Sequence, residues 1–292
     1  MKVLQFTVPV AFDKTIIIQD EVLPHFYNHL HRHEEIQLTW VREGEGTLIA
    51  GNNMHLFNSG EIYFLGANMP HLFKNDHTYF ADDSTKTIHA TTIFFNPKGT
   101  LAPLFSLPEL KNVYSFLLKF QSGFKVPDNF TSDIADGIQK ILLTEGIEQF
   151  MNFLQLLTKM SIIQNLQPLA VDTYPSTIND NEGMRIAHIY NYLIQNYEKP
   201  LTLEDVAEQA FMTPHSFCRY FKKHTRHTLL GFLNKIRVNE ACKLLINGDF
   251  KGVPEVAYNC GFNSITNFNR VFKSITGLSP KMYAGQYINR SQ

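Results

Sequence analysis

The sequence predicts an α+β protein, with an N-terminal β-barrel and a helical segment followed by an all-α domain that holds two helix-turn-helix units. Three observations predict this order. The first 95 residues contain short β-branched runs separated by Gly- and Asn-rich turns, and residues 109–166 have the apolar spacing of helices. Between Leu203 and Pro280 one helical pattern occurs twice. A chain of 292 residues is long enough for two hydrophobic cores.

The N-terminal part is predicted to build its barrel from short strands. The predicted strands cover residues 16–18, 36–41, 47–50, 62–65 and 87–95, and the predicted turns cover 43–46, 51–53 and 58–61. Many short strands with evenly spaced turns are typical of a β-sandwich or a small barrel, which we place at residues 1–95.

A connector with several prolines follows the barrel, and the apolar spacing then becomes helical. Helices are predicted over 109–120, 131–143 and 146–166. The last helix carries an apolar stripe formed by Ile147, Phe150, Met151, Leu154, Leu157 and Ile162. This stripe either packs on the barrel of its own chain or pairs with a second subunit. Residues 1–167 are thus predicted to be one domain, and 168–182, rich in Pro, Thr, Asn and Asp, a linker to a second domain at 183–292.

The repeated pattern predicts two helix-turn-helix units, at 201–225 and 253–276. Val206 and Val256 are 50 residues apart, whereas Phe221 and Phe272 are 51 apart, so the copies differ by one residue in the turn. The apolar residues of the two second helices recur at helical spacing: Phe217, Tyr220 and Phe221, then Phe268, Val271, Phe272 and Ile275. A helix over 229–246 joins the units; at about 1.5 Å per residue it spans roughly 26 Å.

The opposite face of each second helix is polar and basic. It carries His215, Cys218, Arg219, Lys222 and Lys223 in the first copy, and Ile265, Thr266, Asn269, Arg270 and Lys273 in the second. A helix-turn-helix can place such a face in the major groove of double-stranded DNA. One copy alone would equally fit a helical bundle with a solvated face, but two copies with matched Arg and Lys positions favour DNA binding. The connecting helix could hold both in successive grooves, about 34 Å apart.

Arginine and lysine are assigned different contacts on this surface. Arg219 and Arg270 are candidates for bidentate guanine contacts, with phosphate contact or a surface ion pair as the alternative. Lys222, Lys223 and Lys273 are interpreted as phosphate contacts, which position a protein on DNA but carry little sequence information.

Charge and cysteine content agree with this division. The net charge is −1, but residues 182–292 hold 14 Lys and Arg against 8 Asp and Glu, whereas residues 1–181 hold 12 against 19. A basic domain joined to an acidic one is typical of a nucleic-acid binder attached to a part that does not bind DNA. The three cysteines form no CxxC pair, residues 1–12 lack a signal-peptide pattern, and no apolar run could span a membrane. A cytoplasmic protein without membrane contact is predicted.

The second copy resembles a known family. The run Ala257-Tyr258-Asn259-Cys260-Gly261-Phe262-Asn263-Ser264, then Phe268-x-Arg270-x-Phe272-Lys273, Thr276-Gly277-Leu278-Ser279-Pro280 and Tyr283, is similar to the AraC/XylS family of bacterial transcription regulators. The resemblance extends from Met184 to Tyr287 and is broken at Phe211 and Arg226, turn positions where small residues are common. It implies a homodimer formed through the helices before the linker. It also implies base contacts by His215, Cys218, Arg219, Ile265, Thr266, Asn269 and Arg270.

A second resemblance covers Phe26 to Phe95. The spacing of His31-x-His33, Gly44-x-Gly46, Gly60-Glu61 and Pro70-His71 is similar to the cupin barrel that many AraC-type regulators carry as a sensing domain. In cupin enzymes the positions of His31, His33, His71 and a Glu bind a metal. Here the Glu position is Gln37, and a neutral amide weakens such a site. No metal and no cofactor are therefore predicted, although His31, His33 and His71 are metal candidates; with Gln37 they are interpreted as ligand-binding residues, and a structural role is the alternative.

These observations favour a DNA-binding transcription regulator that responds to a small molecule bound in the N-terminal barrel, with RNA polymerase as a further partner. One rival is a cupin-type metal-dependent enzyme with an appended helical domain, which Gln37 disfavours. Another is a DNA-binding regulator that needs no ligand. No enzymatic activity is predicted.

Overall fold

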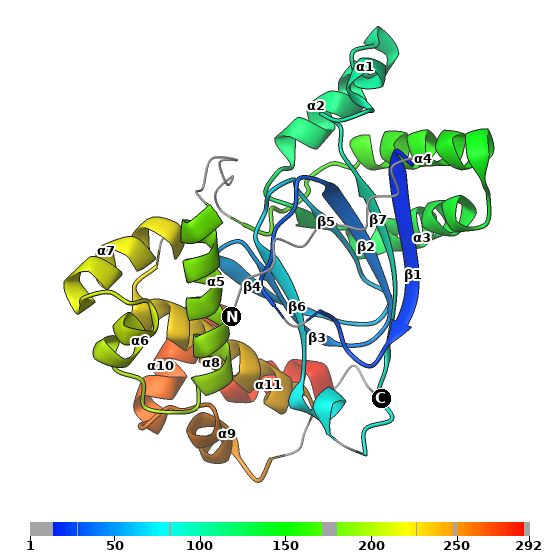
Figure 1. Ribbon diagram of the computed structural model, residues 1–292. Coiled ribbons are helices and arrows are strands. Elements are labelled where there is room, and N and C mark those ends of the chain that lie inside the picture. Colours follow the sequence, from blue (N-terminus) through cyan, green and yellow to red (C-terminus); the bar gives the residue numbers. More distant parts are fainter. Residues whose placement is uncertain are drawn as a thin grey trace. The chain divides into compact units, whose positions relative to one another are not determined.

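The computed structural model of the protein describes residues 14–27, 29–81, 83–170, 180–225, 227–247 and 250–288. The chain divides into two compact units, residues 1–178 and 179–292 (Figure 1). The described strands all lie in the N-terminal unit, and the C-terminal unit is helical. The predicted α+β class is confirmed.

The strands of the N-terminal unit form two antiparallel sheets. The strands are β1 (Ile16–Leu23), β2 (Ile36–Glu43), β3 (Gly46–Ala50), β4 (Asn53–Phe57), β5 (Ile62–Leu65), β6 (His71–Asn75), β7 (Ile88–Phe95) and β8 (Phe124–Lys125). Their order is β1-β7-β2-β5-β8 in the larger sheet and β4-β3-β6 in the smaller one. Among the described residues no strand belongs to both sheets, so the closed barrel that the strand pattern predicted is an open pair of sheets. β4, β6 and β8 were not predicted.

The two faces of the larger sheet differ because successive side chains of a strand point to opposite sides. On β2, Ile36 and Leu38 belong to a buried cluster with residues of α2 (Lys111–Lys119), α3 (Asp128–Leu142) and α4 (Gly146–Ser161). Val41 belongs to a second buried cluster, which contains residues from both sheets. Gln37 and Thr39 alternate with Ile36 and Leu38, so they face the interior between the two sheets, where both are buried. Short helical segments at α1 (Ala102–Phe105), η1 (His77–Phe80) and η2 (Pro108–Leu110) complete this unit.

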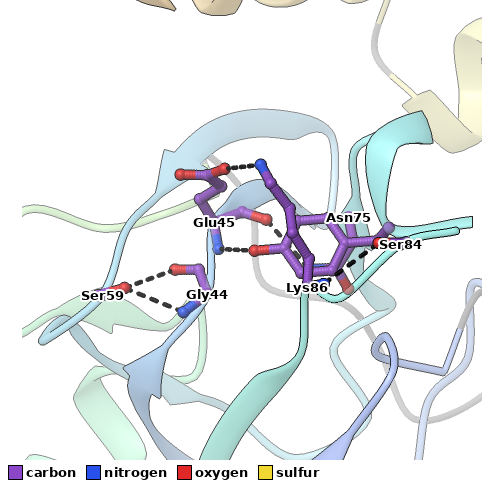
Figure 2. Close-up of polar contacts among 7 residues, drawn as sticks. Gly44, Glu45, Ser59, Asn75, Ser84 and Lys86 are labelled. Carbon is purple, nitrogen blue, oxygen red and sulfur yellow. Dashed lines mark hydrogen bonds and ion pairs between the residues drawn. The ribbon is translucent and has the colours of Figure 1, made fainter. Parts of the chain in front are cut away.

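The turn between β2 and β3 ties several segments of this unit together (Figure 2). The carboxylate of Glu45 accepts a hydrogen bond from Lys86 Nζ at 2.8 Å, and its backbone N–H donates to Tyr79 Oη at 3.2 Å. Its carbonyl oxygen accepts from Asn75 Nδ2 at 3.0 Å. The turn is thereby joined to the end of β6, to η1 and to the segment before β7.

The predicted linker at 168–182 contributes its first residues to the N-terminal core. Leu169 and Ala170 are buried in the cluster between the sheets, and Leu169 N–H donates to Gly123 O at 3.0 Å. Residues 171–179 lie outside the described residues, as does the segment before Lys14. The first helix of the C-terminal unit begins at Asp180, three residues before the predicted domain start.

The C-terminal unit consists of helices joined by short turns. Its helices are α5 (Asp180–Asn196), α6 (Leu203–Gln209), α7 (Pro214–Thr225), α8 (Leu229–Asn247), α9 (Val253–Asn259), α10 (Ile265–Thr276) and α11 (Pro280–Ile288). Phe217 and Phe221 of α7 and Phe268 and Phe272 of α10 are buried, as their spacing predicted. Ile275 was predicted to face the core but is 41% exposed, because α10 ends one residue later and Gly277 turns the chain away in a left-handed conformation.

Candidate functional site

The two helix-turn-helix units are built from the same local interactions. Thr213 caps α7 by accepting from Ser216 N–H at 3.4 Å, and Ser264 caps α10 by accepting from Asn267 N–H at 3.4 Å. At the opposite ends, the Thr225 hydroxyl donates to Phe221 O at 2.8 Å and the Thr276 hydroxyl to Phe272 O at 2.9 Å. These matched bonds give the repeat seen in the sequence a physical basis.

The neighbouring phenylalanines of α7 and α10 also repeat. The ring centroids of Phe217 and Phe221 are 5.4 Å apart, and so are those of Phe268 and Phe272. Burial of these rings fixes the rotation of each helix about its axis. The opposite, basic face of each helix is consequently held toward solvent.

Nine of the ten residues predicted to contact DNA are exposed. The exposed ones are His215, Cys218, Arg219, Lys222 and Lys223 on α7, and Thr266, Asn269, Arg270 and Lys273 on α10; Ile265 is half-buried. Arg270 NH2 donates to Asn267 Oδ1 at 2.9 Å, a bond within one helical turn that orients the guanidinium along the surface of α10. The arrangement presents polar and positively charged groups on both helices, which suits contact with base edges and phosphates.

The turns of the two units occupy equivalent positions but differ in their surroundings. Phe211 and Gly261 both adopt the left-handed conformation, with φ of 55° and 78°. Phe211 is 92% exposed, whereas a Cβ atom on Gly261 would lie 2.6 Å from Tyr197 O. Arg226, the other departure from the family pattern, lies outside the described residues.

Arg237 of α8 was not singled out from the sequence, yet it joins three parts of the C-terminal unit. It is 8% exposed, its Nε donates to Tyr197 O at 2.8 Å, and its NH2 donates to Lys199 O at 2.9 Å. Its guanidinium also lies 5.8 Å from the ring centre of Phe262, in the second turn. The signal in the sequence was its spacing of four residues from the apolar Leu233 and Ala241, which places Arg237 on the buried face of α8.

In the N-terminal unit the structure brings together His31, His33, Gln37 and His71. His31 and His71 are opposite each other in an isolated antiparallel bridge, with backbone hydrogen bonds of 3.1 and 2.9 Å. His33 and His71 are buried and His31 is half-buried. Gln37 Oε1 lies 3.0 Å from His33 Nε2 and 2.9 Å from His71 Nε2. We call these four residues the histidine cluster.

All three imidazoles of the histidine cluster have Nδ1 against a backbone carbonyl oxygen. The distances are 2.9 Å for His31 to His29 O, 2.9 Å for His33 to Glu35 O, and 2.8 Å for His71 to Met69 O. Burial lowers the pKa of His31 to about 4, lowers the pKa of His33, and holds the pKa of His71 well below its usual value. The rings are therefore neutral at neutral pH.

The histidine cluster fits a transition-metal ion. The available ligand atoms of the three histidines lie within 4.8 Å of one another. A zinc ion bound to imidazole at about 2.0–2.1 Å would separate tetrahedral ligand atoms by roughly 3.3 Å, so modest side-chain shifts suffice. An Nδ1–H donated to a carbonyl oxygen is also the usual outer contact of a metal-binding histidine. Bound there, a metal would act as a Lewis acid held by the three Nε2 atoms.

The C-terminal unit matches a known domain, and the whole chain is similar to known proteins. A family model described as a helix-turn-helix domain matches residues 206–286. The uncharacterized HTH-type transcriptional regulator YdeC of Bacillus subtilis is 24% identical over 286 residues, covering 94% of this chain and 91% of that protein. The HTH-type transcriptional activator RhaS of Mannheimia succiniciproducens is 22% identical over 251 residues, covering 86% of this chain and 87% of that protein. The protein is a transcription regulator, and its residues 206–286 form a helix-turn-helix domain of the AraC type.

The C-terminal unit of the regulator is accordingly its DNA-binding domain. A crystal structure of the DNA-binding domain of AdpA in complex with a target DNA aligns with 36% of the regulator and 95% of that chain, at 30% identity and a TM-score of 0.35. Among the described residues of the regulator, no helix has the length and apolar character needed to cross a lipid bilayer.

Proposed function

We propose that the regulator reads one DNA site with α7 and α10 in successive major grooves. The observation that carries this proposal is the exposure of Arg219 and Arg270 at equivalent positions of two helices with the same internal bonds. The side chains that would face base edges are His215, Cys218 and Arg219 on α7 and Ile265, Thr266, Asn269 and Arg270 on α10. A guanidinium pairs bidentately with guanine O6 and N7, which supplies sequence discrimination.

The lysines of the two helices would contact the phosphates. Lys222, Lys223 and Lys273 lie one turn beyond the arginines and are exposed. Each phosphate contact releases a counterion, so the logarithm of affinity should fall with the logarithm of salt concentration by about 0.9 per contact. These phosphate contacts determine where the protein sits on the duplex and how binding depends on salt, whereas the arginines determine which base sequence is bound.

Both helices contact α8, whose 19 residues span roughly 28 Å at about 1.5 Å per residue. We expect a genome-wide footprint of the full-length protein to reveal two short submotifs with centres about 10–10.5 base pairs apart. Protection without sequence preference, or of a single submotif, would contradict the two-groove arrangement. The genes beside the protected sites would indicate the sign of regulation and any contact with RNA polymerase.

A second copy of the chain is the proposed partner of α4. The predicted apolar stripe is divided: Leu157 is buried in the chain's own core, whereas Ile147, Met151 and Ile162 are 75%, 54% and 72% exposed. The three exposed residues share one face of the helix, because they lie at intervals of four and eleven residues. Leu143, at the C-terminal end of α3, is also exposed (74%). A two-fold dimer through this face of α4 would double the DNA footprint.

We expect Ile147→Glu combined with Met151→Glu to convert a dimer into a monomer, because two charges would be buried on association. Sedimentation equilibrium measures the change in mass. Leu107→Glu is the matched control, since Leu107 is also exposed (46%) but lies outside α4. A double variant that keeps the mass of the wild type would exclude this face as the dimer interface.

The histidine cluster is the proposed ligand site of the N-terminal unit. It gathers three imidazoles and an amide in the interior between the sheets, where most neighbouring side chains are apolar. A ligand that binds only the folded protein raises its unfolding temperature, so a thermal-shift screen with organic acids, sugars, aromatic compounds and metal ions tests the assignment. A shift that disappears in His71→Gln supports it. A DNA-binding regulator that needs no ligand would give no shift.

A further inference from the structure

The protonation of the histidine cluster follows from its hydrogen bonds. A carbonyl oxygen only accepts, so each Nδ1 that lies against one must carry the proton. In a neutral imidazole the other nitrogen, Nε2, is then an unprotonated acceptor. Such an Nε2 atom carries a lone pair that can bind a metal ion, and the available ligand atoms of the three histidines lie within 4.8 Å of one another.

Gln37 adds a fourth acceptor to this set. Its Oε1 lies 3.0 Å from His33 Nε2 and 2.9 Å from His71 Nε2, and no proton is available between these atoms. Two acceptors at such a distance repel each other. The repulsion ends in one of two ways: a cation enters among the four atoms, or the amide makes a half-turn so that its NH2 group donates to both Nε2 atoms.

Thr39 and Thr92 allow both positions of the amide. Gln37 Nε2 donates to Thr39 Oγ1 at 2.8 Å, and Thr39 Oγ1 lies 3.1 Å from Thr92 Oγ1. A hydroxyl both donates and accepts, so Thr39 can accept from the amide NH2 or, after the half-turn, donate to the amide oxygen. A glutamate at position 37 would have no NH2 group to offer the histidines when the site holds no ion.

We propose that the histidine cluster is a reversible site for a divalent transition-metal ion, with Gln37 as a ligand that takes two positions. With the ion bound, three Nε2 atoms and Gln37 Oε1 coordinate it. Without the ion, the amide is turned and its NH2 group satisfies His33 and His71. This inference rests on the proposed ligand-binding role of the N-terminal unit and names the ligand class.

The ligand set determines which ions fit. Imidazole nitrogen suits Zn²⁺, Cu²⁺, Ni²⁺, Co²⁺ and Fe²⁺, whereas Mg²⁺ and Ca²⁺ prefer oxygen ligands. Within the four-residue cluster no ligand is anionic, so the bound ion keeps its full charge and the site holds it less tightly than one with a carboxylate. Half-buried His31 leaves the cluster accessible from one side. A metal sensor needs a stable metal-free form and an ion that can leave. An enzyme that keeps its metal permanently needs neither.

The test uses the full-length protein, freed of metal by chelation and dialysis. We expect Co²⁺ to give the absorption bands of a four-coordinate ion, saturating at one ion per chain, and Zn²⁺ to displace it in a calorimetric titration. Gln37→Leu and Thr39→Val should each weaken Zn²⁺ binding by about 10-fold or more, the first by removing a ligand and the second by releasing its orientation. Gln37→Glu should bind Zn²⁺ more tightly yet unfold at a lower temperature than the wild type when metal-free.

Nitrogen NMR of the imidazoles gives a readout that does not depend on affinity. The metal-free protein should show three neutral rings with Nδ1 protonated, and Zn²⁺ should move the three Nε2 signals. His89 bonds to Asp20 on the face of β7 that points away from the histidine cluster. His89→Gln is therefore the matched control and should bind Zn²⁺ like the wild type. Absence of saturable binding, or wild-type binding by His71→Gln or Gln37→Leu, would overturn the proposal.

Footprinting the same samples on their DNA sites separates this inference from the proposed function. If the wild-type protein protects its DNA sites but binds no Zn²⁺, only the proposed metal site is contradicted. An absent footprint with intact Zn²⁺ binding contradicts the reading of DNA by α7 and α10 and leaves the metal site standing.

Discussion

Replacing Arg270 with Ala is expected to weaken binding to the specific DNA site and to leave the fold intact. Arg270 is exposed, so its removal opens no cavity, and the bond that it loses is a surface bond to Asn267. A bidentate contact to guanine supplies about 1–3 kcal/mol of discrimination, which corresponds to roughly 5- to 150-fold in affinity. Gel-shift titration on a footprinted site and on a scrambled sequence measures the loss, and circular dichroism reports the fold.

Two further variants define what Arg270 does. Arg270→Lys keeps the charge but loses the planar pair of donors, so it should lose most of the discrimination and keep the salt dependence. Lys281→Ala, an exposed basic residue on α11, is the matched control for charge and should retain discrimination. Unchanged affinity of Arg270→Ala for the specific site would reject base reading by α10.

Replacing Gly261 with Ala is expected to destabilise the C-terminal unit by about 2–4 kcal/mol, from the left-handed backbone and the crowding together. The added Cβ would lie 2.6 Å from Tyr197 O and 2.8 Å from Glu198 O, both backbone atoms at the end of α5. It would also lie 3.0 Å from Arg237 Nε, so relief would disturb the bond from Arg237 to Tyr197 O. Urea unfolding followed by the helical circular-dichroism signal measures the free-energy change.

The repeat supplies a control at the equivalent position. Phe211→Ala also places Ala in a left-handed conformation, but Phe211 is 92% exposed. Phe already has a Cβ atom, so this substitution adds no left-handed strain, and an exposed substitution usually changes stability by less than about 0.5 kcal/mol. The difference between the two variants therefore measures the strain and the crowding that a Cβ atom at Gly261 adds together. Equal effects of the two substitutions would show that contact with α5 and Arg237 does not hold the second turn in place.

Most of the longer helices could be predicted from the sequence, with errors of up to five residues at their ends, whereas α1 and α11 were not predicted. The apolar residues of the predicted helices recur at helical spacing over two turns or more, and the doubled pattern of the C-terminal unit supported each copy with the other. Strands were harder, because β4 and β6 mix His, Asn and Lys with apolar residues and lack a regular alternation. β8 has two residues, too few for any period to be read.

The sites were predictable to different degrees. Exposure of Arg219 and Arg270 followed from the helical period alone. The four residues of the histidine cluster were predicted together from the resemblance to the cupin barrel, but no periodicity places them together, because His31 and His71 are 40 positions apart and meet through a single backbone bridge. Gln37 could be placed near His33 by strand alternation, but its contacts with Thr39 and His71 depend on three-dimensional packing. The buried Arg237 was hidden because a charged residue is ordinarily assigned to the surface.

The three thiols of the regulator differ in their access to solvent. Burial raises the pKa of Cys242 to about 11 and that of Cys260 to about 12, so neither forms appreciable thiolate near neutrality. Cys218 is exposed on α7, among the groups assigned to base contact. A thiol-directed fluorophore would consequently label the unmutated protein at the first recognition helix, and occupancy of the first groove could be followed optically.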